Sequence, residues 1–308
     1  EIYTLSLHDA LPICVSGFRM AEQIQGIQRR IKSINSTERI TNAMKLVSAS
    51  KLRKAKAIYE HSREYLGRIV ESIEEAFDIQ ERLPEKYLLR NREIKNTCYI
   101  IITGSNGLCG SFNGNLIRHV DENITGSCGN IKMVTIGSKG REHFEQLCYE
   151  IIDKHDPPAD TMDYEKVITI ADPLLNKYLS GEIDEIILVY TAYINSLKQE
   201  VVEKRILPID LKSRERNMRG EVNNIEFEPS IDEVFEYLMY KYLEMNIYSA
   251  VIESATCEHA ARRQAMENAN DSANDMLRGL ETEYNHARQS RITDEIIEIV
   301  SGAEAQES

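Results

Sequence analysis

The sequence has no tryptophan, and six of its seven prolines lie between residues 84 and 229, the other being Pro12. Residues 20–83 and 230–308 contain no proline and only two glycines each. A proline inside a helix costs about 3 kcal/mol and a glycine about 1 kcal/mol. Both ends are therefore predicted to form very long helices, which is not the pattern of a compact enzyme.

The six cysteines lack the CxxC spacing of a zinc site or a disulfide framework. We therefore expect a reducing, cytoplasmic setting and no metal or other cofactor. The longest apolar runs are also shorter than the roughly 20 residues that a membrane-spanning helix requires. The sequence thus predicts no direct insertion into a membrane.

The net charge of −13 argues against nucleic acid as the main partner. One segment is nevertheless basic, because residues 21–60 hold nine Lys and Arg against three acidic residues. A specific acidic partner surface and an ordinary solvated helix face both explain this asymmetry.

Residues 1–19 differ from the rest of the chain. They lack a basic start, and His8, Asp9 and Pro12 interrupt their apolar run, so they make a poor signal peptide. Our hypothesis is that Met20 is the native initiator and that residues 1–19 are a non-native leader, a scar or adapter.

Apolar residues in the first stretch repeat at alternating spacings of three and four, which is the signature of a two-helix seam. This spacing holds for Ile24, Ile27, Ile31 and Ile34, and the predicted stripe then continues through Ile40, Met44 and Val47. At the other end, Ser230 is a predicted N-cap with Glu233 completing a capping box. Roughly 70 residues at about 1.5 Å each give a rod on the order of 100 Å, whose stripe the other helix is expected to cover.

The middle of the chain alternates strand-like and helix-like segments. Apolar, β-branched runs at Cys98–Thr103, Ile131–Ile136 and Ile183–Tyr190 alternate with helical stretches at 111–124, 139–148 and 163–180. Such alternation predicts a parallel, Rossmann-like α/β sheet, with Gln199–Ile206 as an edge strand. The polar segment 212–228 is predicted to be a flexible loop.

Two glycine-containing turns follow predicted strands. Gly104–Gly110 has the spacing GxxGxxG instead of the dinucleotide pattern GxGxxG, and Gly137–Gly140 lacks the upstream glycine of a P-loop. Tight turns without a ligand explain both better than a nucleotide site does. Cys109 lacks a readable base and is predicted to be a buried structural residue, and His259 and His286 are predicted to be surface residues.

Four blocks in this order resemble the gamma subunits of bacterial F-type ATP synthases. They are residues 40–54 (ITNAMKLVSASKLRK), 103–113 (TGSNGLCGSFN), 136–140 (IGSKG) and the pair 258–266 with 284–303. The chain departs from the family's usual Ala-Thr-Asp-Asn-Ala at Ala269–Ala273, so contacts there are expected to differ in detail.

The resemblance implies a rotor without a catalytic site of its own. The terminal helices would form an antiparallel coiled coil inside a ring of alternating alpha and beta subunits, with the α/β domain against the epsilon subunit and the c-ring. Proton flow would turn this central shaft and drive ATP synthesis at the beta-subunit sites. The complex would lie at the cytoplasmic face of the bacterial cell membrane as a peripheral assembly.

By motif match, the resemblance also implies a rotor–stator contact. Its expected residues are Met44, Lys45, Lys51, Arg53, Arg262, Gln289, Thr293 and Glu295. The basic segment Lys45–Lys56 would face acidic beta-subunit loops, and the small side chains of Ser254–Ala273 would give shallow contacts with the ring. Solvation of the helix pair is the competing interpretation for each residue.

The predicted organisation has six parts. They are 1–19 leader, 20–83 N-terminal coiled-coil helix, 84–211 central α/β domain, 212–228 flexible loop, 229–303 C-terminal coiled-coil helix and 304–308 tail. Two other functions stay open on the sequence: a coiled-coil scaffold with an α/β head and no rotary role, and a nucleotide-binding enzyme that uses Gly104–Gly110.

Overall fold

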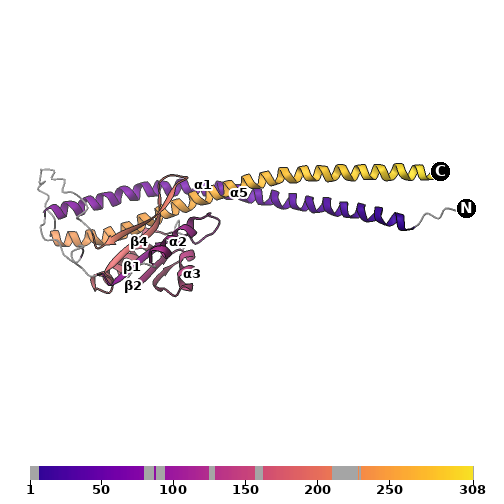
Figure 1. The fold of residues 1–308 in the computed structure, drawn as a ribbon. Helices are drawn as coiled ribbons and strands as arrows, with labels where there is room; N and C mark the ends of the chain where they lie inside the picture. The colour runs from indigo at the N-terminus through magenta and orange to yellow at the C-terminus, as the bar shows by residue number, and fades with distance from the viewer. Residues whose placement is uncertain are drawn as a thin grey trace. The chain divides into compact units, whose positions relative to one another are not determined.

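The computed structural model describes residues 7–79, 87, 94–124, 129–156, 162–209, 228 and 230–307. Two helices dominate it, α1 (Leu7–Ile79, 73 residues) and α5 (Ile231–Glu307, 77 residues), drawn in Figure 1 from indigo to purple and from orange to yellow. The chain divides into two units, residues 1–46 with 266–308 and residues 47–265. No helix within the described ranges combines the length and apolar character that crossing a membrane requires.

The helix boundaries agree with the predicted long helices and differ in detail. Helix α1 begins at Leu7, ahead of the predicted start at Met20, so it includes part of the predicted leader. Helix α5 begins where the capping box placed it, because the amide of Glu233 donates to Ser230 Oγ at 3.3 Å. The predicted flexible loop lies almost wholly outside the described residues. Of the predicted tail 304–308, residues 304–307 belong to helix α5 and only Ser308 lies outside the described residues.

In the first unit, α1 and α5 run side by side in opposite directions (Figure 1). Ile24 and Ile27 are buried, and Ile31 and Ile34 are half-buried, which confirms the first part of the predicted seam. Gln28 Nε2 donates to the hydroxyl of Tyr284 across the pair at 3.1 Å. The α5 side of this seam repeats at spacings of four and three through Met266, Asn270, Ala273, Leu277, Leu280, Tyr284 and Ala287.

The continuation of the predicted stripe in α1 is wrong. Ile40 and Val47 are 58% and 57% exposed, whereas Thr41 and Ser48 are buried. The alternation of three and four that starts at Ile24 leads to Thr41 and Ser48, and the apolar residues at 40 and 47 lie one position off it. The seam is polar in this part of α1. A prediction that follows only the apolar residues therefore places the seam on the wrong face of the helix.

The second unit contains a five-stranded sheet with strand order β3-β2-β1-β4-β5. The strands are β1 (Asn96–Ile102), β2 (Asn130–Ile136), β3 (Glu150–His155), β4 (Glu185–Tyr193) and β5 (Gln199–Leu207). The first four are parallel to their neighbours, and β5 pairs antiparallel with β4. The predicted Rossmann-like sheet and its edge strand are confirmed, and β3 is an additional strand that was not predicted.

Helices cover both faces of this sheet, which is why its central strands are almost entirely apolar. Successive side chains of β1 point to opposite faces. Tyr99 and Ile101 pack in a cluster with α2 (Phe112–Ile124) and α3 (Ser138–Gln146). Ile100 and Ile102 belong to a larger cluster with α4 (Tyr164–Leu179) and with parts of α1 and α5.

Helix α5 is enclosed on all sides in the middle of the second unit. Every residue of the segment 249–260 is buried. The small side chains of this segment therefore pack within the chain, which corrects the expectation that all of Ser254–Ala273 offers shallow contacts to a surrounding ring. Small residues let the sheet, its loops and α1 approach the helix closely.

Candidate functional site

The carboxyl ends of β1 and β4 form the place where a ligand would be expected. The chain leaves β1 toward β2 on one side and later returns to β4 on the other side. In open α/β sheets, ligands bind in the crevice outside the carboxyl ends of the strands at this switch of direction. The glycine loop Gly104–Gly110 follows β1 directly, so the question is which groups fill the crevice.

The turn after β2 depends on a glycine. Gly137 has φ of +99°, and a Cβ atom there would lie 2.1 Å from the backbone oxygen of Thr103. Its amide donates to His155 O at 2.7 Å, and the amide of Thr103 donates to Ile136 O at 2.7 Å. The absence of a side chain at Gly137 thus lets the loops after β1 and β2 lie in direct contact.

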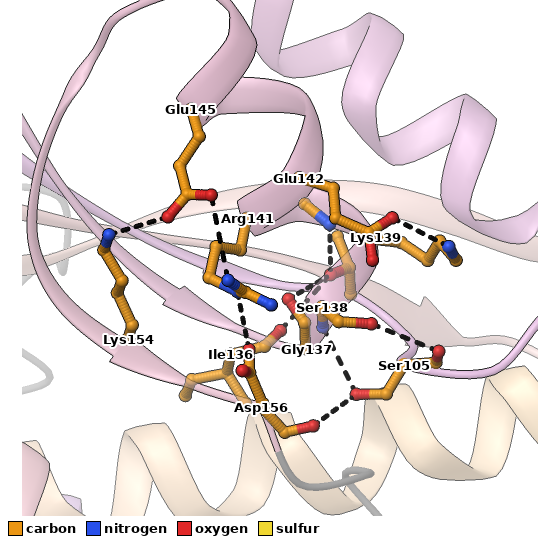
Figure 2. Close-up of polar contacts among 12 residues, drawn as sticks. Ser105, Ile136, Gly137, Ser138, Lys139, Arg141, Glu142, Glu145, Lys154 and Asp156 are labelled. Carbon is orange, nitrogen blue, oxygen red and sulfur yellow. Dashed lines mark hydrogen bonds and ion pairs between the residues drawn. The ribbon is translucent and has the colours of Figure 1, made fainter.

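The chain's own oxygen atoms occupy the first amides of α3 (Figure 2). The amide of Ser138 donates to Ser105 Oγ at 3.3 Å, that of Lys139 to Gly104 O at 3.3 Å, and that of Gly140 to Thr103 Oγ1 at 2.9 Å. A helix N-terminus binds a phosphate through such free amides. Since these donors are engaged, the geometry favours the interpretation of this turn as a structural joint.

Charged side chains surround the same turn, as Figure 2 shows. Arg141 Nε lies 2.7 Å from Asp156 Oδ1, and Lys154 Nζ lies 2.6 Å from Glu145 Oε1. The carboxylate of Glu145 has a lowered pKa because Lys154 donates a hydrogen bond to it. These exposed pairs join α3 to the edge strand β3, and each is expected to contribute little on its own.

Helix α5 fills the crevice beside the glycine loop. A Cβ atom at Gly104 would lie 2.9 Å from the carboxyl carbon of Glu258, so a side chain there would displace this carboxylate. Arg262, one turn further along, pairs with Glu258 Oε1. Its guanidinium also donates to the backbone oxygen of Gly107 at 3.3 Å from both Nε and Nη2.

A small buried cluster completes this joint. Cys109 and Phe112 pack against Cys257 of α5, and all three are buried. Burial, followed by the charge of Glu258, raises the pKa of the Cys109 thiol, so it stays protonated and is a weak nucleophile. The prediction of Cys109 as a buried structural cysteine is confirmed.

Taken together, these contacts make the Gly104–Gly110 loop a mechanical joint between the sheet and α5. The predicted glycine turns are correctly placed, but their partners Glu258 and Arg262 were not predicted for this role. They are about 150 residues away along the chain, and no local pattern signals such a pairing. His259, between them, is buried and not at the surface as predicted, whereas His286 is exposed as predicted.

The eight predicted rotor–stator residues fall in both units. Met44, Lys45, Gln289, Thr293 and Glu295 belong to the first unit, and Lys51, Arg53 and Arg262 to the second. Seven of them are exposed or half-buried, whereas Arg262 is only 8% exposed and engaged with the glycine loop. The contact itself stays a prediction for all eight.

The last turns of α5 are exposed and partly apolar. Thr293 donates to the backbone oxygen of Gln289 at 3.0 Å, and Glu295 pairs with Arg291 at 2.8 Å. Ile296, Ile297, Ile299 and Val300 lie in the same segment and are 50–71% exposed. This end of the helix therefore offers both polar and apolar side chains to a partner.

Known proteins resemble the chain over nearly its whole length. The sequence model of a family described as ATP synthase matches residues 23–306. The sodium-ion-specific ATP synthase gamma chain of Acetobacterium woodii is 36% identical over 304 residues, covering 93% of this chain and 99% of that protein. The ATP synthase gamma chain of Alkaliphilus metalliredigens is 37% identical over 293 residues, with coverage of 93% and 99%.

Solved structures show the same fold. A chain of the mitochondrial ATP synthase of Euglena gracilis (OSCP/F1/c-ring) aligns with a TM-score of 0.64 at 18% identity, covering 93% of this chain and 95% of that one. A chain from the central stalk and c-ring structure of the Tetrahymena thermophila enzyme aligns with a TM-score of 0.59 at 21% identity, with coverage of 75% and 99%. On the family match and the sequence identities, the chain belongs to the ATP synthase family, among the gamma chains of bacterial F-type enzymes.

Proposed function

We propose that the chain is the central rotor shaft of an F-type ATP synthase and couples ion flow through a c-ring to ATP synthesis at beta-subunit sites. The observation that carries this proposal is the 36–37% identity to ATP synthase gamma chains across their whole length. The two helices of 73 and 77 residues, paired along a seam in the first unit, suit a part that carries torque.

The proposed partners are a ring of alternating alpha and beta subunits, the epsilon subunit and the c-ring, at the cytoplasmic face of the cell membrane. The exposed end of α5 with Gln289, Thr293 and Glu295, and the basic stretch of α1 with Lys51 and Arg53, are the surfaces proposed to meet the ring. Met44, Lys45 and Arg262 complete the proposed contact, with Arg262 acting through the glycine loop that it holds.

In this proposal the chain has no catalytic site, and nucleotide and magnesium belong to the neighbouring subunits. Two observations support it: the chain's own oxygens occupy the first amides of α3, and Glu258 and Arg262 of α5 contact the glycine loop. The proposed coupling ion is the proton. Sodium is the alternative, because the relative from Acetobacterium woodii is a gamma chain described as sodium ion specific.

The test is reconstitution of the complete complex in vesicles with and without this chain. We expect multi-site ATP turnover, and ATP-driven ion uptake, only when the chain is present. Proton and sodium uptake are measured in parallel to identify the ion. Stoichiometric assembly without any change in turnover or uptake would instead favour the scaffold alternative.

A further inference from the structure

A buried carboxylate connects three elements of the second unit. Glu253 of α5 is 8% exposed, and its Oε1 atom accepts hydrogen bonds from the hydroxyl of Tyr59 on α1 at 3.1 Å and from the amide of Tyr193 on β4 at 2.9 Å. The rings of Tyr59 and Tyr193 also touch edge to face, with centroids 6.4 Å apart. We call Tyr59, Tyr193 and Glu253 the Glu253 node.

The node lies in the seam of α1. The alternation of three and four that begins at Ile24 includes Tyr59 and continues through Ser62 to Ile69 and Ile73. Apolar seam residues hold two helices together, but neighbouring registers bury similar apolar areas. A buried polar contact is satisfied in only one register, and this is the best-attested use of polar groups in such seams.

The node also reaches the hydrogen-bonded turn between β4 and β5. Tyr193 ends β4, and its hydroxyl contacts Ser196 Oγ at 3.0 Å within the turn toward β5. In the same turn, Asn195 Oδ1 accepts hydrogen bonds from the amides of Leu197 and Lys198 at 2.9 and 2.8 Å. A displacement of α5 along its axis would therefore break a bond to a turn that has little freedom to follow.

Burial raises the pKa of this carboxyl group. The hydrogen bonds from Tyr193 and Tyr59, and the charges of Arg63 on α1 and Lys204 on β5, oppose that shift without cancelling it. Lys204 is itself held by Asn246 Oδ1 of α5 at 2.8 Å, two turns before Glu253. The hydroxyl of Tyr190 on β4, whose pKa is raised by burial and then by the charge of Glu253, faces the same group.

We propose that Glu253 is a positioning residue, whose carboxylate fixes the register of α1 against α5 and ties both helices to the β4–β5 hairpin, so that torque passes between sheet and helices without slip. This inference rests on the proposed rotor function. The hydrogen-bond acceptor, and not only the charge, is what the geometry requires at this position.

The test compares variants in the reconstituted complex by the number of ions taken up per ATP hydrolysed. Glu253→Leu removes the acceptor, Tyr59→Phe removes one donor with little change of volume, and Glu253→Gln keeps an acceptor. We expect the ratio to fall by about half or more in the first two and to stay near the original value with Gln. The control is Tyr65→Phe, since Tyr65 on the same helix is 51% exposed.

A second measurement follows the bond itself. In the full chain, Glu253→Leu is expected to speed hydrogen exchange of the Tyr193 amide by about tenfold or more, whereas Glu253→Gln leaves it nearly unchanged. If Glu253→Leu fails to assemble, Tyr59→Phe decides the question, with exchange measured in α1 around residue 59.

Two results would overturn the inference. One is an unchanged ratio of uptake to hydrolysis in both Tyr59→Phe and Glu253→Leu, and the other is a loss with Glu253→Gln as large as that with Leu. If the unaltered chain supports no uptake at all, the rotor function itself fails. The exchange of the Tyr193 amide then still reports whether Glu253 holds β4 against α5.

Discussion

At the scale of single residues, the joint between the sheet and α5 depends on side chains that are absent. Gly104 leaves room for Glu258, and Gly137 leaves room for the backbone of Thr103. Sequence spacing identified both glycines as turn residues, because a glycine after a strand is a local signal. It did not identify what each glycine makes room for, since Glu258 belongs to a segment more than a hundred residues away.

We expect Gly137→Ala to destabilise the chain strongly, by about 3 kcal/mol or more, because a methyl group would overlap Thr103 O at a positive φ. The measurement is urea-induced unfolding of the full chain. Gly67→Ala serves as the control, because Gly67 is an exposed residue of α1 with no atom near its Cβ position. For Gly67→Ala we expect the free energy of unfolding to rise by about 0.5–1 kcal/mol. Equal effects at the two sites would contradict the assigned close contact.

The pH dependence of Glu253 gives a second prediction at this scale. Burial raises the pKa of this carboxyl group above its ordinary value in the folded chain. Below the unfolded-state pKa both states are protonated, and ionisation of the group contributes nothing to stability. Above the folded-state pKa both are ionised, and the cost of burying the charge opposes folding in full.

The free energy of unfolding of Glu253→Gln, relative to the original chain, should therefore rise as pH increases through the folded-state pKa of Glu253. Denaturant titrations of both proteins between about pH 4 and pH 8 measure this difference. Tyr59→Phe is the control, because it keeps the carboxyl group of Glu253. Its free energy of unfolding should vary with pH in nearly the same way as that of the original chain. A difference that falls with rising pH would mean that Arg63 and Lys204 outweigh the effect of burial.

At the scale of elements, the sequence-based prediction was accurate where the residues have a strong apolar pattern and failed where they mix polar and apolar side chains. The apolar, β-branched strand at Ile131–Ile136 was predicted almost to its observed ends. Strand β3 was missed because its sequence, Glu150 to His155, mixes charges with apolar residues, as edge strands do to avoid unwanted pairing. The seam of α1 was followed correctly as far as Ile34 and was lost where it becomes polar at Thr41 and Ser48.

The observed seam makes a prediction that differs from the apolar stripe read from the sequence. We expect Ile27→Ala to cost about 2 kcal/mol or more, because Ile27 is 4% exposed. Ile40→Ala should change stability by less than about 0.5 kcal/mol, because Ile40 is 58% exposed. Thermal unfolding of the full chain measures both. A larger loss of stability for Ile40→Ala than for Ile27→Ala would support the apolar stripe read from the sequence and contradict a seam that passes through Thr41.

At the scale of the whole molecule, charge is distributed unevenly. The chain carries a net charge of −13, and yet residues 21–60 are strongly basic. Lys51 and Arg53 are exposed within this segment. Such a surface attracts an acidic partner over a distance without fixing one pose, which suits a contact that breaks and forms again as a shaft turns.

Reversing both charges, Lys51→Glu with Arg53→Glu, should lower ATP-driven ion uptake while the complex still assembles. The defect should become smaller as ionic strength rises, because salt screens the new repulsion. Arg68→Glu is the matched control, since Arg68 is an exposed residue of the same helix outside the basic segment. Unchanged uptake in the double variant, at low and high salt alike, would remove these two residues from the proposed contact.

The seam positions of α1 recur every 3.5 residues on average, from Ile24 to Ala76. A straight α-helix has 3.6 residues per turn, so two helices that follow this repeat coil around each other with a left-handed twist. Because this coil is left-handed, the two directions of twist are not equivalent. Twist in one direction tightens the two helices against each other, and twist in the other direction loosens them. Synthesis and hydrolysis apply opposite twists to a rotor shaft, so we expect such a helix pair to be stiffer under one of them than under the other.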